Sequence, residues 1–233
     1  MKQLFSILSI AILLSSCSSI TGSGHIVTDK RQAGSFTGIT SSGGIEVEIT
    51  QGSSPSISVE ADDNLISHIE TRVEGSVLKI SLKGIHNVRN AHMKVYVTAP
   101  VINMLHASSG SSMEVKNVLT SGGKLSLNAS SAGSIHAHLD APEVEANASS
   151  AGSLTLKGKT KTYSATSSSG ASIKSPDLLS ENTEASASSG GNAHVHASVN
   201  LFAHASSGGS VVYNGAGAVH SSVSSGGDVK MGN

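Results

Sequence analysis

Apolar and polar residues alternate along most of this chain, which is the pattern of β-strands that bury one face. The segments 45–49, 77–82 and 93–97 alternate without interruption. After residue 108 no stretch shows the 3.6-residue period of a helix. The pattern therefore predicts an all-β protein.

A Ser-Ser-Gly or Ser-Ser-Ala-Gly motif recurs through the second half of the chain. Each copy follows a small or apolar residue that is itself preceded by a polar one, and alternation resumes after it. Each repeat thus indicates a strand, a tight corner, a second strand and a turn, because small residues allow sharp bends. The copies begin at Ser108, Ser130, Ser149, Ser168, Ser188, Ser206 and Ser224, at nearly even intervals.

A strand repeat of roughly 20 residues predicts a right-handed, single-stranded parallel β-helix (solenoid) with an N-terminal cap. A leucine-rich repeat would show a Leu and Asn ladder that is absent here, and a propeller blade needs about 40 residues. An earlier copy, Ser41-Ser42-Gly43-Gly44, lies far enough before Ser108 to leave room for three more coils. We expect residues 24–107 to form the cap and opening coils, and residues 108–233 to form the repeat coils.

The first residues have the features of an export signal. Lys2 is followed by an apolar run, Leu4–Leu14, that is too short to span a membrane. Leu14-Ser15-Ser16-Cys17 resembles a lipobox, in which the Cys is acylated before cleavage ahead of it. We expect residues 1–16 to be a signal peptide, Cys17 to carry lipid, and residues 17–23 to form a short tether. The alternative is a plain signal peptide with an unrelated Cys.

Composition limits the possible partners and the interior. Cys17 is the only Cys, so no disulfide can form within the chain. The formal net charge is −1 with acids and bases interspersed, which lacks the basic surface of a nucleic-acid-binding protein. Aromatic residues make up 3% of the chain, whereas there are 25 Gly residues. A chain with few large rings and many small residues is expected to have a narrow, tightly stacked core.

Three N-terminal segments followed by Ser-Ser-Gly repeats resemble a known family. The segments are Phe36–Ile39, Ile45–Gly52 and Val59–Leu65. In this order they are similar to the head GIN domain of auto-transporter adhesins, which is common in exported proteins of Bacteroidota. The resemblance covers about residues 24–233 and implies a right-handed β-helix and an exported location. It supplies no catalytic or ligand-binding residues.

Two His-x-His pairs are the strongest candidates for metal binding. His136 and His138 should share one strand face, as should His194 and His196, an arrangement that suits zinc or copper. The pairs lie three coils apart, about 14 Å, so they cannot share one ion. With evenly spaced coils, the two coils between the pairs place no carboxylate at the positions of the His residues. At the position of His138 and His196 they place Lys157 and then Pro176. We therefore expect surface histidines, with no metal or other cofactor.

Polysaccharide lyases and glycosidases also use β-helices. Such sites need clustered carboxylates, or a carboxylate with a base, often with calcium. Glu143 and Glu145 share a strand face, but we identify no basic partner at their height, and we place Glu181 and Glu184 in a turn. The even repeat spacing leaves no long loops for an active site. We therefore expect a protein that is not an enzyme, with a polysaccharide-active enzyme as the alternative.

The sequence predicts a non-enzymatic cell-envelope lipoprotein, expected at the outer membrane because Ser18 after the Cys is not acidic. Its partners would be the membrane, through Cys17, and an envelope or extracellular protein or glycan bound in the manner of an adhesin. A purely structural envelope component is a further alternative. The expected binding face is an outward column after the corner, with Glu114, His136, His138, Thr155, Lys174, His194 and His196.

Overall fold

The computed structural model describes residues 19–32, 34–85, 87–215 and 217–232. The expected signal peptide and Cys17 lie outside these ranges. Within them the protein is all-β, and its one helical segment is the 3-10 turn η1 (Ile66–His68). Among these residues, then, no helix has the length and apolar character needed to cross a membrane.

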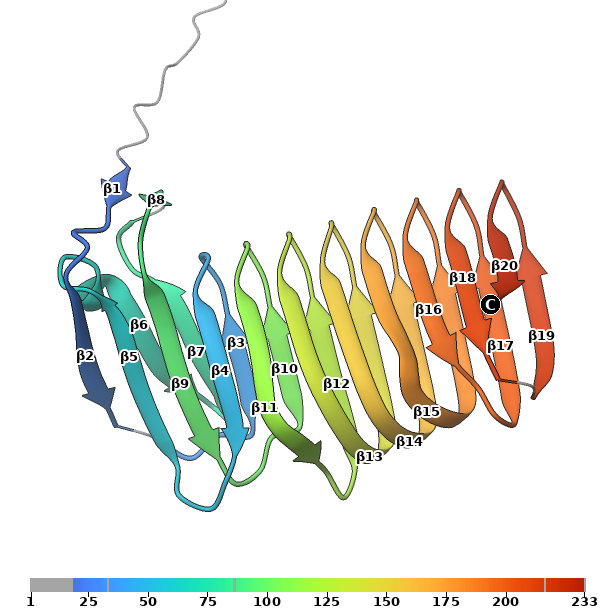
Figure 1. The fold of residues 1–233 in the computed structure, drawn as a ribbon, viewed down its shortest axis with the longest axis horizontal. Helices are drawn as coiled ribbons and strands as arrows, with labels where there is room; N and C mark the ends of the chain where they lie inside the picture. Colours follow the sequence, from blue (N-terminus) through green and yellow to red (C-terminus); the bar gives the residue numbers. More distant parts are fainter. Residues whose placement is uncertain (1–18, 33, 86, 216, 233) are drawn as a thin grey trace, which may run out of the picture.

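The repeats form a β-solenoid in which two sheets face each other (Figure 1). Strands before each corner form the pre-corner sheet, and strands after it form the post-corner sheet. The pre-corner sheet contains β10 (Met104–Ala107), β12 (Lys124–Ala129), the second halves of β13 (Ser134–Ala148), β14 (Ser153–Ser167) and β15 (Ser172–Ala187), then β17 (Asn200–Ala205) and β19 (Ala218–Val223). The post-corner sheet contains β11 (Ser112–Thr120), the first halves of β13, β14 and β15, then β16 (Asn192–His196), β18 (Ser210–Asn214) and β20 (Asp228–Met231).

The seven corners from Ser108 onward share one backbone conformation. In the first, the Ser111 amide donates to the Ser108 carbonyl (3.1 Å), and the two residues between them have φ values of 49° and 74°. Two successive positive φ values with this bond are typical of a type I′ turn. Each corner also bonds to the next, as when the Gly110 amide donates to the Ser131 carbonyl (3.0 Å). The expected stacking of corners, one per coil, is confirmed.

The core between the sheets is narrowest beside the corners. Ala148, Ala187 and Ala205 are buried there, as the alternation predicted, and His204 on the outer face is exposed. Asn147 and Ser186, also expected outside, are half-buried. Outward side chains contact those of adjacent rungs, so that Asn147 Nδ2 donates to Asn128 Oδ1 (3.2 Å). This contact is one step of a polar ladder on the outer face.

The prediction of three coils between Ser41 and Ser108 is wrong. β3 (Gly38–Ser41) pairs directly with β10, and β4 (Glu46–Gln51) pairs directly with β11. The corner at Ser42 therefore stacks on the corner at Ser108, although a long stretch of chain separates the two motifs. Ser41 is in register with Ala107, so the corner begins at Ser42, one residue later than the motif indicated.

The residues between these two corners extend both sheets at the N-terminal end. β7 (Val77–Leu82) pairs in parallel with β3, and β6 (Ile69–Glu74) pairs antiparallel with β7. In the other sheet, β9 (Met93–Ala99) pairs in parallel with β4. β5 (Ser56–Asp62) then pairs antiparallel with β9 and with β2 (Ile26–Arg31). This end is thus largely antiparallel rather than coiled.

A separate two-stranded sheet lies next to this end. β1 (Ile20–Thr21) pairs in parallel with β8 (Val88–Arg89). Residues 19–23, which the sequence assigned to a tether, are therefore bonded to the fold.

Filling the narrow core should destabilise the protein. Ala187 is 1% exposed beside a corner, whereas Ser186 next to it points outward. We expect Ala187→Phe to cost on the order of 1–3 kcal/mol or more in free energy of unfolding, because the gap cannot hold a ring. Ser186→Phe should cost much less. Chemical denaturation of both variants measures the difference, and similar losses would contradict the assignment of inner and outer faces.

Where the last residue of a corner is Gly, as in five of the seven corners from Ser108 onward, its backbone lies close to the preceding rung; Ser111 and Ala171 hold this position in the other two. A Cβ at Gly209 would lie 2.4 Å from the Ala187 carbonyl oxygen on the preceding rung, whereas a Cβ at Gly122 would meet nothing within 4 Å. Gly209→Ala should therefore lower the melting temperature, with a loss of roughly 1–3 kcal/mol. Gly122→Ala, the control, should leave it nearly unchanged. A harmless Gly209→Ala would show that the corners tolerate wider spacing.

Candidate binding face

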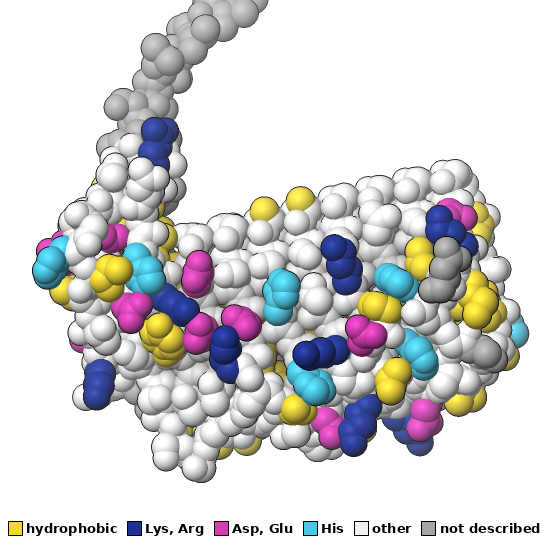
Figure 2. Space-filling model, viewed as in Figure 1, with side chains coloured by type: hydrophobic (Ala, Val, Ile, Leu, Met, Phe, Trp, Pro, Cys, Tyr) yellow, Lys and Arg dark blue, Asp and Glu magenta, His cyan; other side chains and the backbone are white. Residues whose placement is uncertain are grey.

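The pairing register places five of the expected site residues in one column on the outer surface of the post-corner sheet. Glu114 pairs with His136, His136 with Thr155, Thr155 with Lys174, and Lys174 with His194. Figure 2 views this side and shows charged and His side chains spread over it rather than gathered in one cluster.

The two His pairs are three rungs apart, as expected, but their surroundings differ. His138 pairs with Val118 and Lys157, while His194 Nε2 lies 3.1 Å from Asn214 Oδ1. His196 pairs with Asn214, and its Nδ1 is buried without a hydrogen-bond partner. In the part of the chain that the structure describes, no three His, Cys, Asp or Glu side chains converge as metal ligands.

Two β-bulges interrupt this otherwise regular face. The register between β11 and β13 shifts between Glu114 and Val118, and that between β14 and β15 shifts between Thr155 and Lys157. Bulges turn side chains in new directions and are frequent at functional sites. Here they border a hollow of about 340 Å³. Its lining is Glu114, Val115, His136, Ala137, Thr155, Leu156, Lys157, Lys174, Pro176 and Asp177.

The second bulge changes the charges at the hollow. It places Asp177 opposite Lys157, whereas even repeats had predicted Pro176 there. The expectation that no carboxylate enters this region is therefore wrong. Even so, neither Lys157 nor Lys174 comes within 4 Å of an acid in the described chain, and both side chains are exposed. This part of the hollow therefore holds two exposed lysines that have no ion pair within the described residues.

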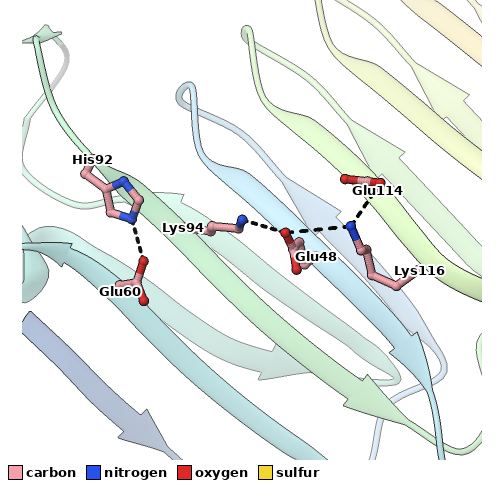
Figure 3. A network of polar contacts seen from close by, with 6 residues as sticks. All are labelled: Glu48, Glu60, His92, Lys94, Glu114 and Lys116. Carbon is pink, nitrogen blue, oxygen red and sulfur yellow. Dashed lines mark hydrogen bonds and ion pairs between the residues drawn. The ribbon is translucent and has the colours of Figure 1, made fainter.

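The other edge of the hollow is acidic but neutralised. Glu114 accepts a hydrogen bond from Lys116 Nζ (3.1 Å), which also lies 4.0 Å from Glu48 (Figure 3). On the other side of Glu48, Lys94 Nζ lies 2.5 Å from Glu48 Oε1. The hydrogen bond between them lowers the pKa of Glu48 and raises the pKa of Lys94, so both remain charged at neutral pH.

Figure 3 also shows a separate pair further toward the N-terminal end. His92 Nε2 lies 2.7 Å from a carboxylate oxygen of Glu60. Glu60 lies in β5 and His92 directly precedes β9, while the other contacts join β9, β4 and β11. All of them hold polar side chains along the strands rather than around a cavity.

The carboxylates considered for catalysis are paired. Lys124 Nζ lies 3.4 Å from Glu143 and 2.7 Å from Glu145, so the expectation that they lack a basic partner is wrong. The bond to Lys124 lowers the pKa of Glu145, so it would be a poor general acid. Glu181 and Glu184 lie within β15 and not in a turn, which corrects that prediction as well.

Sequence reasoning missed an exposed aromatic stack. Phe202 is 55% exposed on the pre-corner sheet, and its ring stacks on His220 with centroids 5.0 Å apart. A hollow of about 580 Å³ lies beside them. Phe202 stands between inward Leu201 and Ala203, so strict alternation would have placed it outside.

Three crystal structures share this fold. A "putative adhesin" from Bacteroides fragilis NCTC 9343 is 21% identical, with a TM-score of 0.82 over 91% of this chain and 99% of its own. A "putative adhesin" from Parabacteroides distasonis ATCC 8503 is 22% identical, with a TM-score of 0.74 over 92% and 100%. A "putative lipid binding protein" from the same strain is 20% identical, with a TM-score of 0.70 over 93% and 100%. At these identities, the comparison establishes the fold alone.

The sequence comparisons give the family. No curated protein matches the chain. Residues 35–217 match the family described as "Putative auto-transporter adhesin, head GIN domain", which confirms the resemblance found in the sequence. The match covers well over half of the chain, and it includes most of both sheets. The chain therefore belongs to the auto-transporter adhesin head GIN-domain family.

Proposed function

We propose that this protein is a non-enzymatic lipoprotein of the cell envelope that binds an anionic group of an extracellular or envelope partner. Cys17 would carry the lipid and hold the protein at the outer membrane. The partner would be a glycan or a protein with exposed acidic groups. The hollow with two unpaired lysines on the post-corner sheet is the observation that carries this proposal.

The chemistry of the hollow supports an anionic ligand. Lys157 and Lys174 lie on consecutive rungs with the Thr155 hydroxyl and the His136 imidazole beside them. These groups can donate hydrogen bonds to carboxylate, sulfate or phosphate oxygens. Other lysines of this sheet, such as Lys94 and Lys116, already contact acids and cannot serve as freely.

The positions of the acidic residues argue against the alternative that the protein is a polysaccharide-active enzyme. Catalysis requires an acid and a base that converge on one bond. Glu143 and Glu145 instead share Lys124, and both lie on the pre-corner sheet away from the hollow. The family's description as an adhesin supports binding. Binding by one open hollow would be weak, and many copies on one membrane would strengthen it.

Neutralising the two lysines should weaken binding to acidic ligands. We expect Lys157→Ala with Lys174→Ala to lower affinity for sulfated or uronic-acid glycans and acidic proteins roughly three- to tenfold, because exposed ion pairs are worth up to about 1 kcal/mol each. Affinity should also fall with added salt. A glycan and protein array followed by titration measures both effects.

The matched control replaces two exposed lysines elsewhere that also contact no acid, Lys30→Ala with Lys161→Ala. It should keep full affinity. Equal losses in both double variants would mean that only overall charge matters. Depolymerisation of a polysaccharide that stops when Glu143 or Glu145 is neutralised would favour an enzyme.

Lipidation of Cys17 has a direct test. Cys17→Ser should move the protein from the membrane fraction to the soluble fraction, because it removes the acylated thiol. Its melting temperature should not change, since the described fold begins after this residue. Metabolic labelling with a fatty acid should mark only the wild type. Equal labelling of the two proteins would contradict the proposal.

A further inference from the structure

The first described residues are hydrogen-bonded into the fold. Between β1 and β8, the Ile20 amide donates to the Asn87 carbonyl (2.9 Å) and the Gly22 amide donates to the Arg89 carbonyl (3.1 Å). Figure 1 shows this small sheet projecting from the N-terminal end of the solenoid, on the side of the corners. Two strands alone are marginally stable in water, so other contacts must hold the sheet in place.

Asp62, at the end of β5, supplies the central contact. Its side chain is buried, with 2% of the residue exposed. One carboxylate oxygen accepts the Gly24 amide (2.6 Å) and the other accepts the His92 amide (2.7 Å). A buried carboxylate that bridges two backbone segments ties the N-terminal residues to the loop before β9.

The next two residues of the chain complete the arrangement. Asn64 donates to the Thr21 carbonyl (2.9 Å) and accepts the Ser23 amide (3.1 Å). Asp63 accepts the Ser23 hydroxyl (2.6 Å). Together with Asp62, these side chains engage residues 21, 23 and 24, and we call this contact set the clasp.

Gly22 shows how closely the clasp fits. A Cβ at this position would lie 2.4 Å from Asp62 Oδ2 and 2.7 Å from the Asn90 carbonyl oxygen. A side chain here would displace either the buried carboxylate or the backbone. The chain therefore passes through the clasp only with Gly at this position.

The clasp leaves almost no free chain before the proposed lipid. Cys17 precedes Ser19, the first described residue, by two positions, which span at most about 7 Å. We propose that the clasp fixes the anchored N-terminus to the fold, so that the β1–β8 lobe (residues 19–24 and 87–90) rests against the lipid headgroups. This inference depends on the proposed lipidation of Cys17.

The surface of the lobe suits a lipid headgroup region. Arg89 on β8 is exposed, and so is Lys83, which lies outside the lobe a few residues earlier in the chain; neither contacts an acid within 4 Å in the described ranges. Exposed cations of this kind attract anionic headgroups. Because the lobe is bonded to the solenoid, its contact with the membrane would fix the direction in which the post-corner hollow faces.

Fluorescence quenching at two positions tests this arrangement. Purified full-length lipoprotein would carry a fluorophore on Asn87→Cys in the lobe, or on Lys230→Cys in β20 at the far end of the solenoid. It would be inserted into phosphatidylcholine–phosphatidylglycerol vesicles with spin-labelled headgroups. We expect severalfold stronger quenching at position 87 than at position 230.

Two changes that release the clasp should remove this difference. A Gly/Ser insertion of about 16 residues between Ser18 and Ser19 adds a root-mean-square length of about 20–24 Å and leaves the fold intact. Asp62→Ala removes the acceptor of two backbone amides. In both proteins, quenching at position 87 should fall to the level at position 230, with membrane attachment retained. Glu46→Ala, at an exposed acid outside both the clasp and the hollow, is the control and should quench as the wild type does.

Two results would overturn the inference while the protein stays on the vesicles: equal quenching at the two positions in the wild type, or an insertion without effect. Absence of fatty-acid labelling together with loss from the vesicles would instead overturn the lipid anchor, and the membrane contact of the lobe with it. The two failures are therefore distinguishable.

Discussion

Close stacking of identical corners is the constraint on which the rest of this structure depends. Each corner needs two residues with positive φ, and its backbone bonds to the corner of the next rung. At Gly133, Gly152 and Gly209 a Cβ would come within 2.4 Å of the preceding rung's backbone. Backbone hydrogen bonds hold neighbouring strands of each sheet about 4.8 Å apart, and the corners must fit the same spacing. The small residues beside the corners, and hence the narrow core, follow as well.

Regular stacking gives a flat surface, so specific features arise where the repeat is broken. Among the copies from Ser108 onward, the longest interval, from Ser108 to Ser130, corresponds to the rung with the β11 bulge. The next longest, from Ser168 to Ser188, corresponds to the β15 bulge. Both bulges border the same hollow. The extra residues of a bulge do not fit into the core and lie on the outer face. There they change which side chains are neighbours, as when the second bulge places Asp177 opposite Lys157.

The N-terminal end follows a different principle from the repeats. A parallel rung needs a corner and a return turn, whereas an antiparallel strand needs only a short hairpin. The chain uses such a hairpin between β6 and β7, where Gly75 has a φ of 61°. Residues 45–103 can therefore extend both sheets and still return β10 to the side of β3. At the same end, buried Asp62 links the first residues of the domain to this antiparallel part.

The sequence by itself determined the all-β class, the corner of each rung and the inward or outward direction of its flanks. These depend on local rules, namely a two-residue period and the small residues that sharp bends require, and the burial of Ala148, Ala187 and Ala205 agrees with them. Only the tertiary structure decided which strands are neighbours. Alternation is the same for a parallel and an antiparallel partner, and for a partner one coil away or much further along the chain, so the pairing of β3 with β10 left no local signal. For the same reason Lys124 was not recognised as the partner of Glu145, nor Asp62 as the clasp of the N-terminus. These contacts join residues that come together only after the sheets have formed.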